Sequence, residues 1–413
     1  MSSKTKTTAT KEEAGPALVP KLRFPEFRGA EGWKPSVLAD ACDMQAGKFV
    51  SASNISERNQ VGLFPCYGGN GLRGYTTTHT HDGTYPLIGR QGALCGNVRL
   101  ASGQFHATEH AVVATPKKAI DVVWLCYSLD LLNLNRFATG QAQPGLSVDV
   151  LENVALAIPP LEPEQKKIAE CLSSVDELIV VQARKLDALK THKKGLMQQL
   201  FPREGETQPR LRFPEFQDAG DWVEYSLGQL IEIASGQVDP KQPPYCDSPQ
   251  IGSENIESHS GKLVNVKSAG EKGVISGNYA FDENDILYSK IRPALNKVAA
   301  PEFKGICSAD IYPIRPADGT LLRSYLFYLL LSQDFLDYAI QNSERGKIPK
   351  INRDALVTYK ALIPLPAEQQ RIADCLSSLD DLIPAQTQTL EALKTHKQGL
   401  MQQLFPSPEA ASA

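Results

Sequence analysis

Two short stretches of the sequence combine residue types and spacings that could do chemistry, and the first suggests zinc. His106, Glu109 and His110 fit a His-x-x-Glu-His zinc-protease pattern, which works only when a helix places both imidazoles on one face. Gln104-Phe105 before the pattern and Ala111-Val112-Val113 after it favour a strand instead. We therefore expect no zinc site, and a metal assay of the pure protein would test the alternative of a zinc enzyme that uses His106 and His110.

The second stretch, Gly69-Asn70-Gly71-Leu72-Arg73-Gly74, fits the GxGxxG fingerprint of dinucleotide-binding proteins. That fingerprint needs a strand before it and a helix after it. Phe64-Pro65-Cys66-Tyr67 is a poor strand, and Tyr75-Thr76-Thr77-Thr78 favours a strand over a helix, so we expect no nucleotide site. The sequence also lacks a GxxxxGK(S/T) loop, an Asn-Pro-Pro-Tyr-type methyltransferase motif and a nuclease motif of paired carboxylates with lysine, which together predict no catalytic site.

Polar and cationic side chains on turns suggest a different chemistry, which is the recognition of DNA. Arg, Asn and Gln can make paired hydrogen bonds to guanine or adenine edges, and Lys neutralises phosphates. For each of these residues taken singly, a solvated loop position is the competing interpretation. The candidates are Tyr67, Asn70, Arg73, Arg90, Gln91, Gln141, Gln143, Lys290, Arg292, Asn296, Lys297, Arg345, Lys347 and Lys350.

Composition limits what such a surface can be. The chain has 43 basic and 47 acidic residues and a net charge of −4, whereas a dedicated nucleic-acid binder is often basic. Any DNA surface must therefore be a local cluster or depend on partners. Eight cysteines without a CxxC pair indicate reduced thiols in a cytoplasmic protein. The first twenty residues fit neither a secretory signal nor an anchor, and no apolar run approaches the roughly 20 residues of a membrane span.

The elements that would position these residues come as a repeat. Leu22-Arg23-Phe24-Pro25-Glu26-Phe27, followed by Trp33, recurs as Leu211-Arg212-Phe213-Pro214-Glu215-Phe216, followed by Trp222. The ends match as well, since residues 164–174, 186–193 and 195–202 reappear closely at 368–378, 390–397 and 399–406. The middles, 28–157 and 217–362, show little similarity. One architecture therefore carries two different surfaces.

Both matched ends predict a long helix with a heptad seam, and Gln182, Lys193, Gln386 and Lys397 occupy its polar positions. Each helix is only marginally stable alone, so we expect the two to pair as an intramolecular antiparallel coiled coil of roughly 55 Å that separates two domains. Pro384 should kink the second helix. The seam residues are Ile168, Leu172, Val175, Ile179, Gln182, Leu186, Leu189, Leu196, Leu200, Ile372, Leu376, Leu379, Ile383, Gln386, Leu390, Leu393, Leu400 and Leu404.

The middles predict mixed strands, turns and some helix. Expected strands include 85–89, 96–100, 111–114, 286–288 and 311–314, and expected helices lie near 122–134 and 321–340. The fold class is therefore α+β, with two domains separated by two long helices and an internal pseudo-two-fold repeat. The predicted order is a disordered tail (1–20), a first domain (21–157), a central helix (158–202), a linker (203–210), a second domain (211–362), a distal helix (363–406) and a tail (407–413).

The alternation of a variable domain and a helix that opens with Pro-Leu and Glu-Gln-x-x-Ile-Ala, repeated once, resembles the specificity subunits of type I restriction–modification systems. The resemblance covers nearly the whole chain after the tail. It rests on the two Phe-Pro-Glu-Phe motifs, Tyr67-Gly68-Gly69-Asn70-Gly71, Gly89-Arg90-Gln91-Gly92, Thr108-Glu109-His110-Ala111 and Asp285-Ile286-Leu287-Tyr288-Ser289-Lys290-Ile291-Arg292-Pro293.

The resemblance implies a non-catalytic, DNA-binding subunit for phage defence and DNA methylation. Its two target-recognition domains would each read one half of a bipartite site in double-stranded DNA. It further implies two modification subunits that bind S-adenosylmethionine and two restriction subunits that use ATP and Mg, with no metal or cofactor on this chain. Those partners would supply part of the DNA clamp, which fits the near-neutral charge.

An alternative from another class is a non-DNA adaptor whose coiled coil spaces two protein-binding domains. The adaptor predicts no salt-dependent DNA binding, whereas phosphate neutralisation requires a steep dependence of affinity on salt. Salt dependence therefore separates the two hypotheses.

Overall fold

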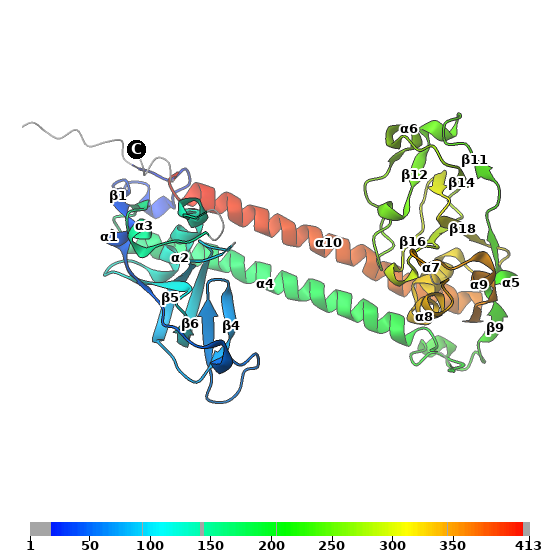
Figure 1. The fold of residues 1–413 in the computed structure, drawn as a ribbon, viewed down its shortest axis with the longest axis horizontal. Helices are drawn as coiled ribbons and strands as arrows, with labels where there is room; N and C mark the ends of the chain where they lie inside the picture. Colours follow the sequence, from blue (N-terminus) through cyan, green and yellow to red (C-terminus); the bar gives the residue numbers. More distant parts are fainter. Residues whose placement is uncertain (1–17, 93, 141–143, 204, 345, 408–413) are drawn as a thin grey trace, which may run out of the picture. The chain divides into compact units, whose positions relative to one another are not determined.

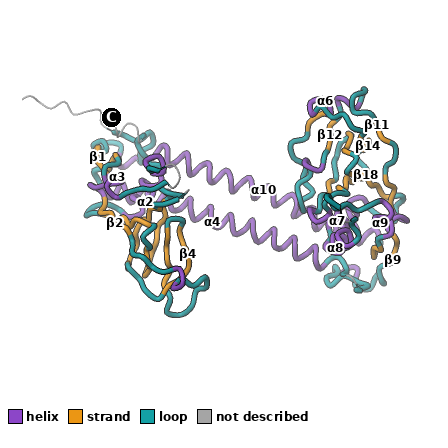
Figure 2. Tube along the Cα trace, viewed as in Figure 1, coloured by secondary structure: helices purple, strands orange, loops and turns teal. Residues whose placement is uncertain are grey.

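The computed structural model describes residues 18–407 apart from 93, 141–143, 204 and 345. The chain divides into two compact units: unit 1 comprises Met1–Ala183 with Thr389–Ala413, and unit 2 comprises Arg184–Gln388. Both units mix strands with helices (Figure 1 and Figure 2), as expected of an α+β protein. The unit boundaries fall inside the two long helices, so the predicted domain limits stay a prediction.

Unit 1 is built on a six-stranded sheet in the order β2-β7-β5-β6-β3-β4, in which only the β3–β6 pair is parallel. A separate antiparallel pair, β1–β8, joins a strand from the beginning of the domain to one from its end. The strands are β1 (Lys34–Val37), β2 (Cys42–Ala46), β3 (Phe64–Gly68), β4 (Gly71–Thr76), β5 (His81–Gly89), β6 (Val98–Ala107), β7 (Ala111–Pro116) and β8 (Ala155–Ile158). The short helices are α1 (Leu38–Ala41), α2 (Val122–Leu131) and α3 (Val148–Glu152), with 3-10 turns at Pro25–Phe27, Ala52–Asn54 and Leu134–Phe137.

Unit 2 contains a four-stranded antiparallel sheet, β10-β18-β15-β16, with the same order and directions as β2-β7-β5-β6 of unit 1. A five-stranded sheet, β11-β14-β17-β12-β13, and the pair β9–β19 complete it. The strands are β9 (Val223–Ser226), β10 (Ile231–Ile233), β11 (Gln237–Val238), β12 (Pro249–Ile251), β13 (Lys267–Ser268), β14 (Asn278–Phe281), β15 (Ile286–Ser289), β16 (Val298–Ala299), β17 (Gly305–Ser308), β18 (Ile311–Pro316) and β19 (Lys360–Ile363). The short helices are α5 (Leu227–Leu230), α6 (Ala269–Lys272), α7 (Arg323–Leu331), α8 (Gln333–Gln341) and α9 (Arg353–Thr358), with 3-10 turns at Pro214–Phe216, Tyr245–Asp247, Ser253–Asn255 and Pro293–Leu295.

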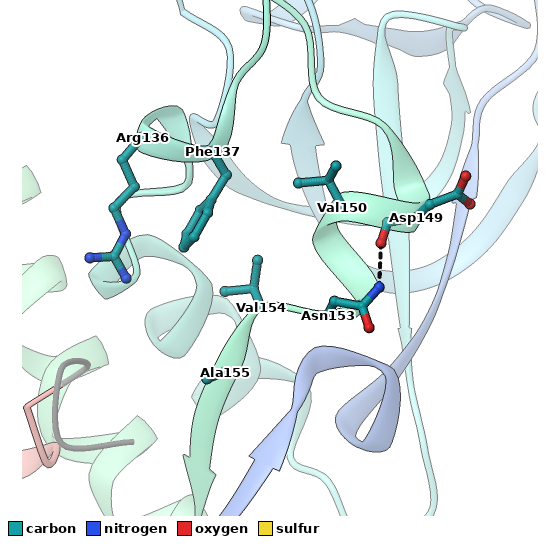
Figure 3. A pocket seen from close by; sticks show the side chains of 7 residues that line it. All are labelled: Arg136, Phe137, Asp149, Val150, Asn153, Val154 and Ala155. Carbon is teal, nitrogen blue, oxygen red and sulfur yellow. Dashed lines mark hydrogen bonds between the residues drawn. The ribbon is translucent and has the colours of Figure 1, made fainter. Parts of the chain in front are cut away.

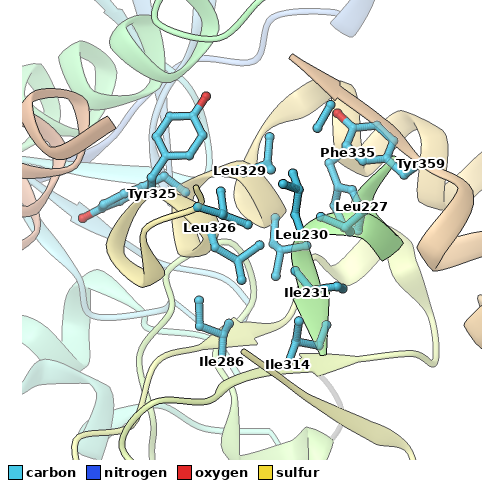
Figure 4. Packing of buried hydrophobic residues seen from close by; sticks show 14 of the residues in the cluster. Leu227, Leu230, Ile231, Ile286, Ile314, Tyr325, Leu326, Leu329, Phe335 and Tyr359 are labelled. Atoms are coloured by element: carbon cyan, nitrogen blue, oxygen red, sulfur yellow. The ribbon is translucent and has the colours of Figure 1, made fainter. Parts of the chain in front are cut away.

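Each unit has its own hydrophobic core. In unit 1, Trp33 and Trp124 are almost fully buried and pack with Phe405, at ring-centroid distances of 5.8 to 6.4 Å. In unit 2 the core gathers residues of α5, β15, β18 and α7 (Figure 4), and Tyr325 stacks on Phe201 at 5.4 Å. The two cores share no residue.

The two long helices are α4 (Glu162–Gln199) and α10 (Pro366–Leu404), and every predicted seam position on them is buried or half-buried. In unit 1 the start of α4, at Ile168 and Leu172, shares a core with Leu404 at the end of α10. In unit 2 the start of α10, at Ile372, shares a core with Leu200, which follows α4. Pairing along the whole length, and a kink at Pro384 within the continuous α10, stay predictions.

The repeated sequence motifs bind the helix starts to their domains. In unit 1 the Arg23 guanidinium donates to both carboxylate oxygens of Glu164, at 2.8 and 2.7 Å, and in unit 2 Arg212 does the same to Glu368, at 2.9 Å for both contacts. The next residue also repeats its role, since the side chains of Gln165 and Gln369 each accept from one backbone N–H and donate to backbone carbonyls of their own domain. These contacts explain why the Leu-Arg-Phe-Pro-Glu-Phe and Glu-Gln sequences occur twice.

The polar lysines of the seam form ion pairs in both units. Lys397 Nζ lies 2.7 Å from an oxygen of Asp176, which also accepts a hydrogen bond of 2.7 Å from the Tyr127 hydroxyl. In unit 2, Lys193 and the Tyr328 hydroxyl bind Asp380 in the same way, at 2.5 and 2.8 Å. Each site joins α4, α10 and a domain helix, so these lysines have defined ionic partners within each unit.

Two predictions of local structure were wrong. Residues 64–67 form part of a real strand, β3, because Cys66 pairs with Gly74 of β4 and, in parallel, with His106 of β6. The helix expected near 321–340 is two helices, α7 and α8, because extended backbone at Ser332 ends the first and its side chain caps the second by accepting from the Phe335 N–H.

The four fully buried thiols give a first testable prediction. Burial raises the pKa of the Cys42 thiol to about 12 and raises the pKa values of Cys66, Cys95 and Cys307 as well. Because only the thiolate is nucleophilic, we expect iodoacetamide at mildly alkaline pH to leave these four unmodified in the native chain and to label all eight cysteines after unfolding. Mass spectrometry of the labelled peptides measures this, and labelling of native Cys42 as fast as that of half-buried Cys246 would contradict it.

Among the helices of the described residues, none is both long enough and apolar enough to cross a membrane.

Candidate nucleic-acid interface

The predicted site of unit 1 lies where the turn between β5 and β6 meets two other loops. The turn closes through a hydrogen bond from Gly89 N to Asn97 O of 2.9 Å, and Arg90 N donates to His110 O, at 3.0 Å, on the β6–β7 turn. Leu146 N donates back to Arg90 O at 2.9 Å, which brings in the loop before α3. Three loops distant in sequence are thus joined by backbone hydrogen bonds alone.

Unit 2 repeats this arrangement with other side chains. Ser289 N donates to Lys297 O at 3.0 Å, Lys290 N donates to Asp310 O at 2.9 Å, and Ile351 N donates to Lys290 O at 2.9 Å. A fourth bond also matches, because Gly92 N donates to Pro144 O in unit 1 and Arg292 N donates to Pro349 O in unit 2. We call this set of four bonds the loop frame. The sequence did not reveal it, because backbone bonds do not require matching side chains.

The loop frame brings most of the unit 1 candidates together. Tyr67 is the next-to-last residue of β3 and its side chain is half-buried, while exposed Asn70 lies in the tight turn that follows. Exposed Arg73 is in β4, and Arg90 and Gln91 follow β5. The glycine-rich turn touches the frame directly, because a Cβ on Gly89 would lie 2.2 Å from Gly69 O. Gln141 and Gln143 lie outside the described residues, but Thr139 and Gly145 on either side of them are hydrogen-bonded to each other at 2.9 Å in both directions.

In unit 2 the frame separates the candidates into two groups. The first group lies on the frame loops or beside them and consists of Lys290, Arg292, Lys347 and Lys350. The Lys290 ammonium lies 5.3 Å from the Tyr312 ring centroid, and Arg292 is exposed. Lys350 also pairs with Glu344 at 3.3 Å. Arg345 lies outside the described residues.

Two other candidates of unit 2 serve the fold. Asn296 is 4% exposed and its amide donates to Leu331 O at 3.2 Å, while the Lys297 ammonium donates to Ser253 O. Their polarity suggested surface contacts, but both side chains satisfy backbone carbonyls inside the domain. We therefore do not include them in the candidate interface.

Among the described residues, eight buried side-chain polar atoms have no hydrogen-bond partner, and four of them lie on the unit 1 frame. Arg90 Nε, Thr108 Oγ1, Glu109 Oε2 and His110 Nδ1 are buried and have no hydrogen-bond partner. Leaving such atoms unpaired is costly, so each of them needs a partner such as a water molecule or a ligand. The sequence analysis named Glu109 and His110 in a zinc-protease pattern and in a motif of the family resemblance, but it did not include them among the candidate DNA-contacting residues.

Neither motif lies on the helix that its function would require. His106 belongs to strand β6, and its two ring nitrogens lie 3.0 Å from Thr78 Oγ1 and 3.0 Å from Lys48 O, so the imidazole is occupied. His110 lies in the following turn, and the described residues contain no cluster of three or more potential metal ligands. The GxGxxG stretch connects β3 to β4 as a hairpin and does not precede a helix.

A separate surface hollow lies near α3 in unit 1 (Figure 3). Its lining combines charged and apolar residues, with Arg136 and Phe137 on one side and Asp149 on the other. The backbone carbonyl of Asp149 accepts a hydrogen bond of 2.7 Å from Asn153 Nδ2. No lining residue has an unpaired buried polar atom, so the loop frame is the stronger candidate in this unit.

The chain matches the family model for the type I restriction modification DNA specificity domain twice, at residues 30–191 and 219–395, which together make up well over half of its length. It is 25% identical over 365 residues to the type I restriction enzyme EcoDI specificity subunit of Escherichia coli, and that match covers 82% of this chain and 79% of the relative. A local match to the EcoprrI specificity subunit of Escherichia coli is 47% identical over 146 residues, or 35% of this chain and 36% of that protein.

Solved structures agree on the fold. The S subunit of a type I restriction–modification system from M. genitalium superposes with a TM-score of 0.63 at 15% identity, covering 94% of this chain and 100% of that one. A chain from a structural study of complex assembly and conformational transition of the type I R-M system gives 0.54 at 16% identity, covering 91% and 98%.

Proposed function

The chain belongs to the type I restriction–modification DNA specificity family, and from this premise we propose that its two loop frames each read one half of a bipartite site in double-stranded DNA. The single observation that carries the proposal is the repeated loop frame. Unit 1 and unit 2 hold their loops with the same four backbone bonds and present different polar side chains on them.

The chemistry of the frame residues supports this assignment. Arg90 can donate to base edges in the major groove, and the amides of Gln91 and Asn70 can both donate and accept there. Lys290, Lys347 and Lys350 can neutralise phosphates. Arg73 and Arg292, both exposed, can do either. The two sets differ in residue type, which fits an asymmetric target whose halves have different sequences.

The long helices fit the role of a spacer in this proposal. Two observations support an antiparallel pairing of α4 and α10 along their length. The start of each helix shares a hydrophobic core with the end of the other, and Lys397 and Lys193 form ion pairs between the two helices. A paired helix of about 38 residues would be a fixed ruler of roughly 55 Å, which sets the gap between the two half-sites.

The partners follow from the family. We infer that the chain is non-catalytic and docks two modification subunits, which use S-adenosylmethionine, and two restriction subunits, which use ATP and Mg. The proposal assigns no cofactor to this chain. The net charge of the chain is −4, which supports the proposal that the partners provide much of the contact with the DNA backbone.

The test of the proposal is a domain exchange. The chain is co-expressed with the modification subunit of its own system, and methylated adenines are mapped across the host DNA by single-molecule sequencing. We expect a split motif with an unspecified gap, and we expect only one half of it to change when residues 28–157 are replaced by those of another family member. A stable complex that adds no methylation would contradict the proposal and favour an adaptor.

A further inference from the structure

Unit 2 contains a counterpart of the glycine-rich turn of unit 1. In unit 1 the strand before that turn, β3, runs parallel to β6, and Cys66 lies beside His106. In unit 2, β12 runs parallel to β17, and Gln250 lies beside Ile306. His106 and Ile306 each come four residues before the residue whose carbonyl accepts a bond of the loop frame. The segment that follows β12, residues 252–255, therefore takes the place of the glycine-rich turn.

This segment is attached to the loop frame of unit 2. Ser253 Oγ lies 2.9 Å from the hydroxyl oxygen of Ser289, which is the counterpart of Gly89 in the frame. In unit 1 the corresponding contact is the close approach of Gly89 to Gly69 O. The Lys297 ammonium also donates to Ser253 O, so the segment is fixed on the frame at two points.

The residue after Ser253 is Glu254, which occupies the place of Asn70 in unit 1. The Glu254 side chain is 67% exposed, and its Oε1 accepts a hydrogen bond of 2.8 Å from the Lys272 ammonium. The carboxylate lies over Gly252, since a Cβ on that glycine would be 2.2 Å from both carboxylate oxygens. An ionised carboxylate has about four acceptor positions, so others remain for a ligand.

Lys272 positions the carboxylate and has no donor left for DNA. An ammonium has three donors, and Lys272 directs them to Glu254, to Asn255 Oδ1 at 3.0 Å and to Gln250 Oε1. Asn255 and Gln250 are each 3% exposed, so the ammonium is anchored to the interior of the domain. Partial burial raises the pKa of Glu254, but the hydrogen bonds from Lys272 and from its own backbone N–H lower that pKa further, so the carboxylate is charged at neutral pH.

Resting on the proposed function, we propose that Glu254 reads one cytosine in the half-site of unit 2. In the major groove cytosine presents an N4 amino donor, from which a carboxylate can accept. Adenine also presents an amino donor, but the N7 acceptor beside it would repel the second carboxylate oxygen. Guanine and thymine present acceptors, which a carboxylate cannot bind. A fixed carboxylate on the frame therefore favours cytosine over the other three bases.

Unit 1 presents a different group at the equivalent position. Asn70 carries an amide, which both donates and accepts and therefore matches the N7 and N6 edge of adenine. A carboxylate at a DNA surface is repelled by the phosphates, so it is favourable only where a base edge donates to it. The difference between Asn70 and Glu254 fits a target whose two halves differ in sequence.

The experiment compares Glu254→Gln and Glu254→Ala with the natural chain, each co-expressed with the modification subunit, by mapping methylated sites. The half-site of unit 2 is the half that stays unchanged when residues 28–157 are exchanged. We expect that half to contain a G·C pair at a fixed position. Glu254→Gln should shift the preference there from cytosine toward adenine by roughly tenfold, because an amide matches adenine. Glu254→Ala should weaken the preference at that position alone.

Two further variants separate base reading from folding. Gly252→Ala keeps the charge of Glu254, but the added Cβ would displace the carboxylate, so the preference should weaken at the same position. The backbone of Gly252 has a φ of −103°, which alanine adopts without strain. Glu283→Gln is the matched control, because it removes an exposed carboxylate that lies 3.8 Å from Lys304 and is not part of the frame. This control should leave the motif unchanged.

The outcomes distinguish the two proposals. A natural chain that yields no split motif would overturn the proposed function itself. A split motif whose unit 2 half contains no G·C pair, or stays the same in Glu254→Gln and Glu254→Ala, would overturn only the inference about Glu254. Loss of all methylation in Glu254→Gln would also overturn it, because Gln keeps the shape of the side chain and such a loss would mark Glu254 as structural.

Discussion

Replacing Glu164 by Ala is expected to lower the free energy of unfolding by about 3–5 kcal/mol, because it leaves a buried charge without its partner. The Arg23 and Glu164 side chains are only 5% and 1% exposed, and their two hydrogen bonds are short. The hydrogen bond to Glu164 raises the pKa of Arg23, so the guanidinium stays charged at every accessible pH. The variant therefore buries a cation whose anion is gone.

Denaturant unfolding of the full chain, followed by tryptophan fluorescence, measures this loss. Trp33 reports on the site directly, since its Nε1 donates to Glu164 at 3.1 Å. The control is Lys166→Ala, which removes an exposed ion pair with Glu162 and should cost at most about 0.5 kcal/mol. A loss below about 1 kcal/mol for Glu164→Ala, within the range of an ordinary hydrogen bond, would contradict the argument.

Glu368→Ala provides a matched comparison in unit 2. Glu368 has the same two bonds from Arg212, but Trp222 Nε1, the counterpart of Trp33 Nε1, has no hydrogen-bond partner. We expect Glu368→Ala to lower the free energy of unfolding by less than Glu164→Ala does. The difference should be about 1.5–3 kcal/mol, which is the contribution of one hydrogen bond to a charged group.

Gly89→Ala is expected to reduce methylation at the natural motif by about a hundredfold, since a displacement of roughly 1 Å in a positioned site can have that effect. The added Cβ would lie 2.2 Å from Gly69 O and 3.1 Å from Leu94 O, which are backbone atoms that cannot rotate away. The glycine-rich turn must therefore move from the end of β5, and Asn70 and Arg90 move apart with it.

The same methylation map measures this variant, and unit 2 shows that the change is local. Ser289, the counterpart of Gly89, carries a Cβ, so the steric limit belongs to unit 1 alone. Gly29→Ala is the control, because nothing lies within 4 Å of a Cβ built there and its backbone is unstrained. A Gly89→Ala chain that methylates the natural motif at its usual level would disprove the close contact between these turns.

The two long helices were predictable from their periodic apolar pattern. Some strands were not, because they form through tertiary contacts. Ile168 and Leu172 are four residues apart, as are Ile372 and Leu376 in the second copy, so the apolar seam could be recognised from the sequence. Strand β3 was missed because Pro65 and Gly68 give it a weak local preference, and it exists through its pairing with β4 and β6.

The candidate site was predictable by residue type only in part. Arg90 and Gln91 were found because they follow a clear strand, but Asn296 has the same polar character and is buried, since its amide satisfies Leu331 O. Glu109 drew attention through a metal pattern, and the turn that carries it is joined to Arg90 by a backbone hydrogen bond from Arg90 N to His110 O. No single-sequence pattern encodes such a bond.

The division of the chain into units also has a consequence for synthesis on the ribosome. Unit 2 is one uninterrupted segment, whereas the core of unit 1 is completed by Met401, Leu404 and Phe405. At about 5–20 residues per second, translation needs on the order of 10–45 s to pass from Ala183 to Phe405. During that interval Trp33 and Trp124 lack Phe405, so the first domain cannot complete its core until the end of the chain has been made.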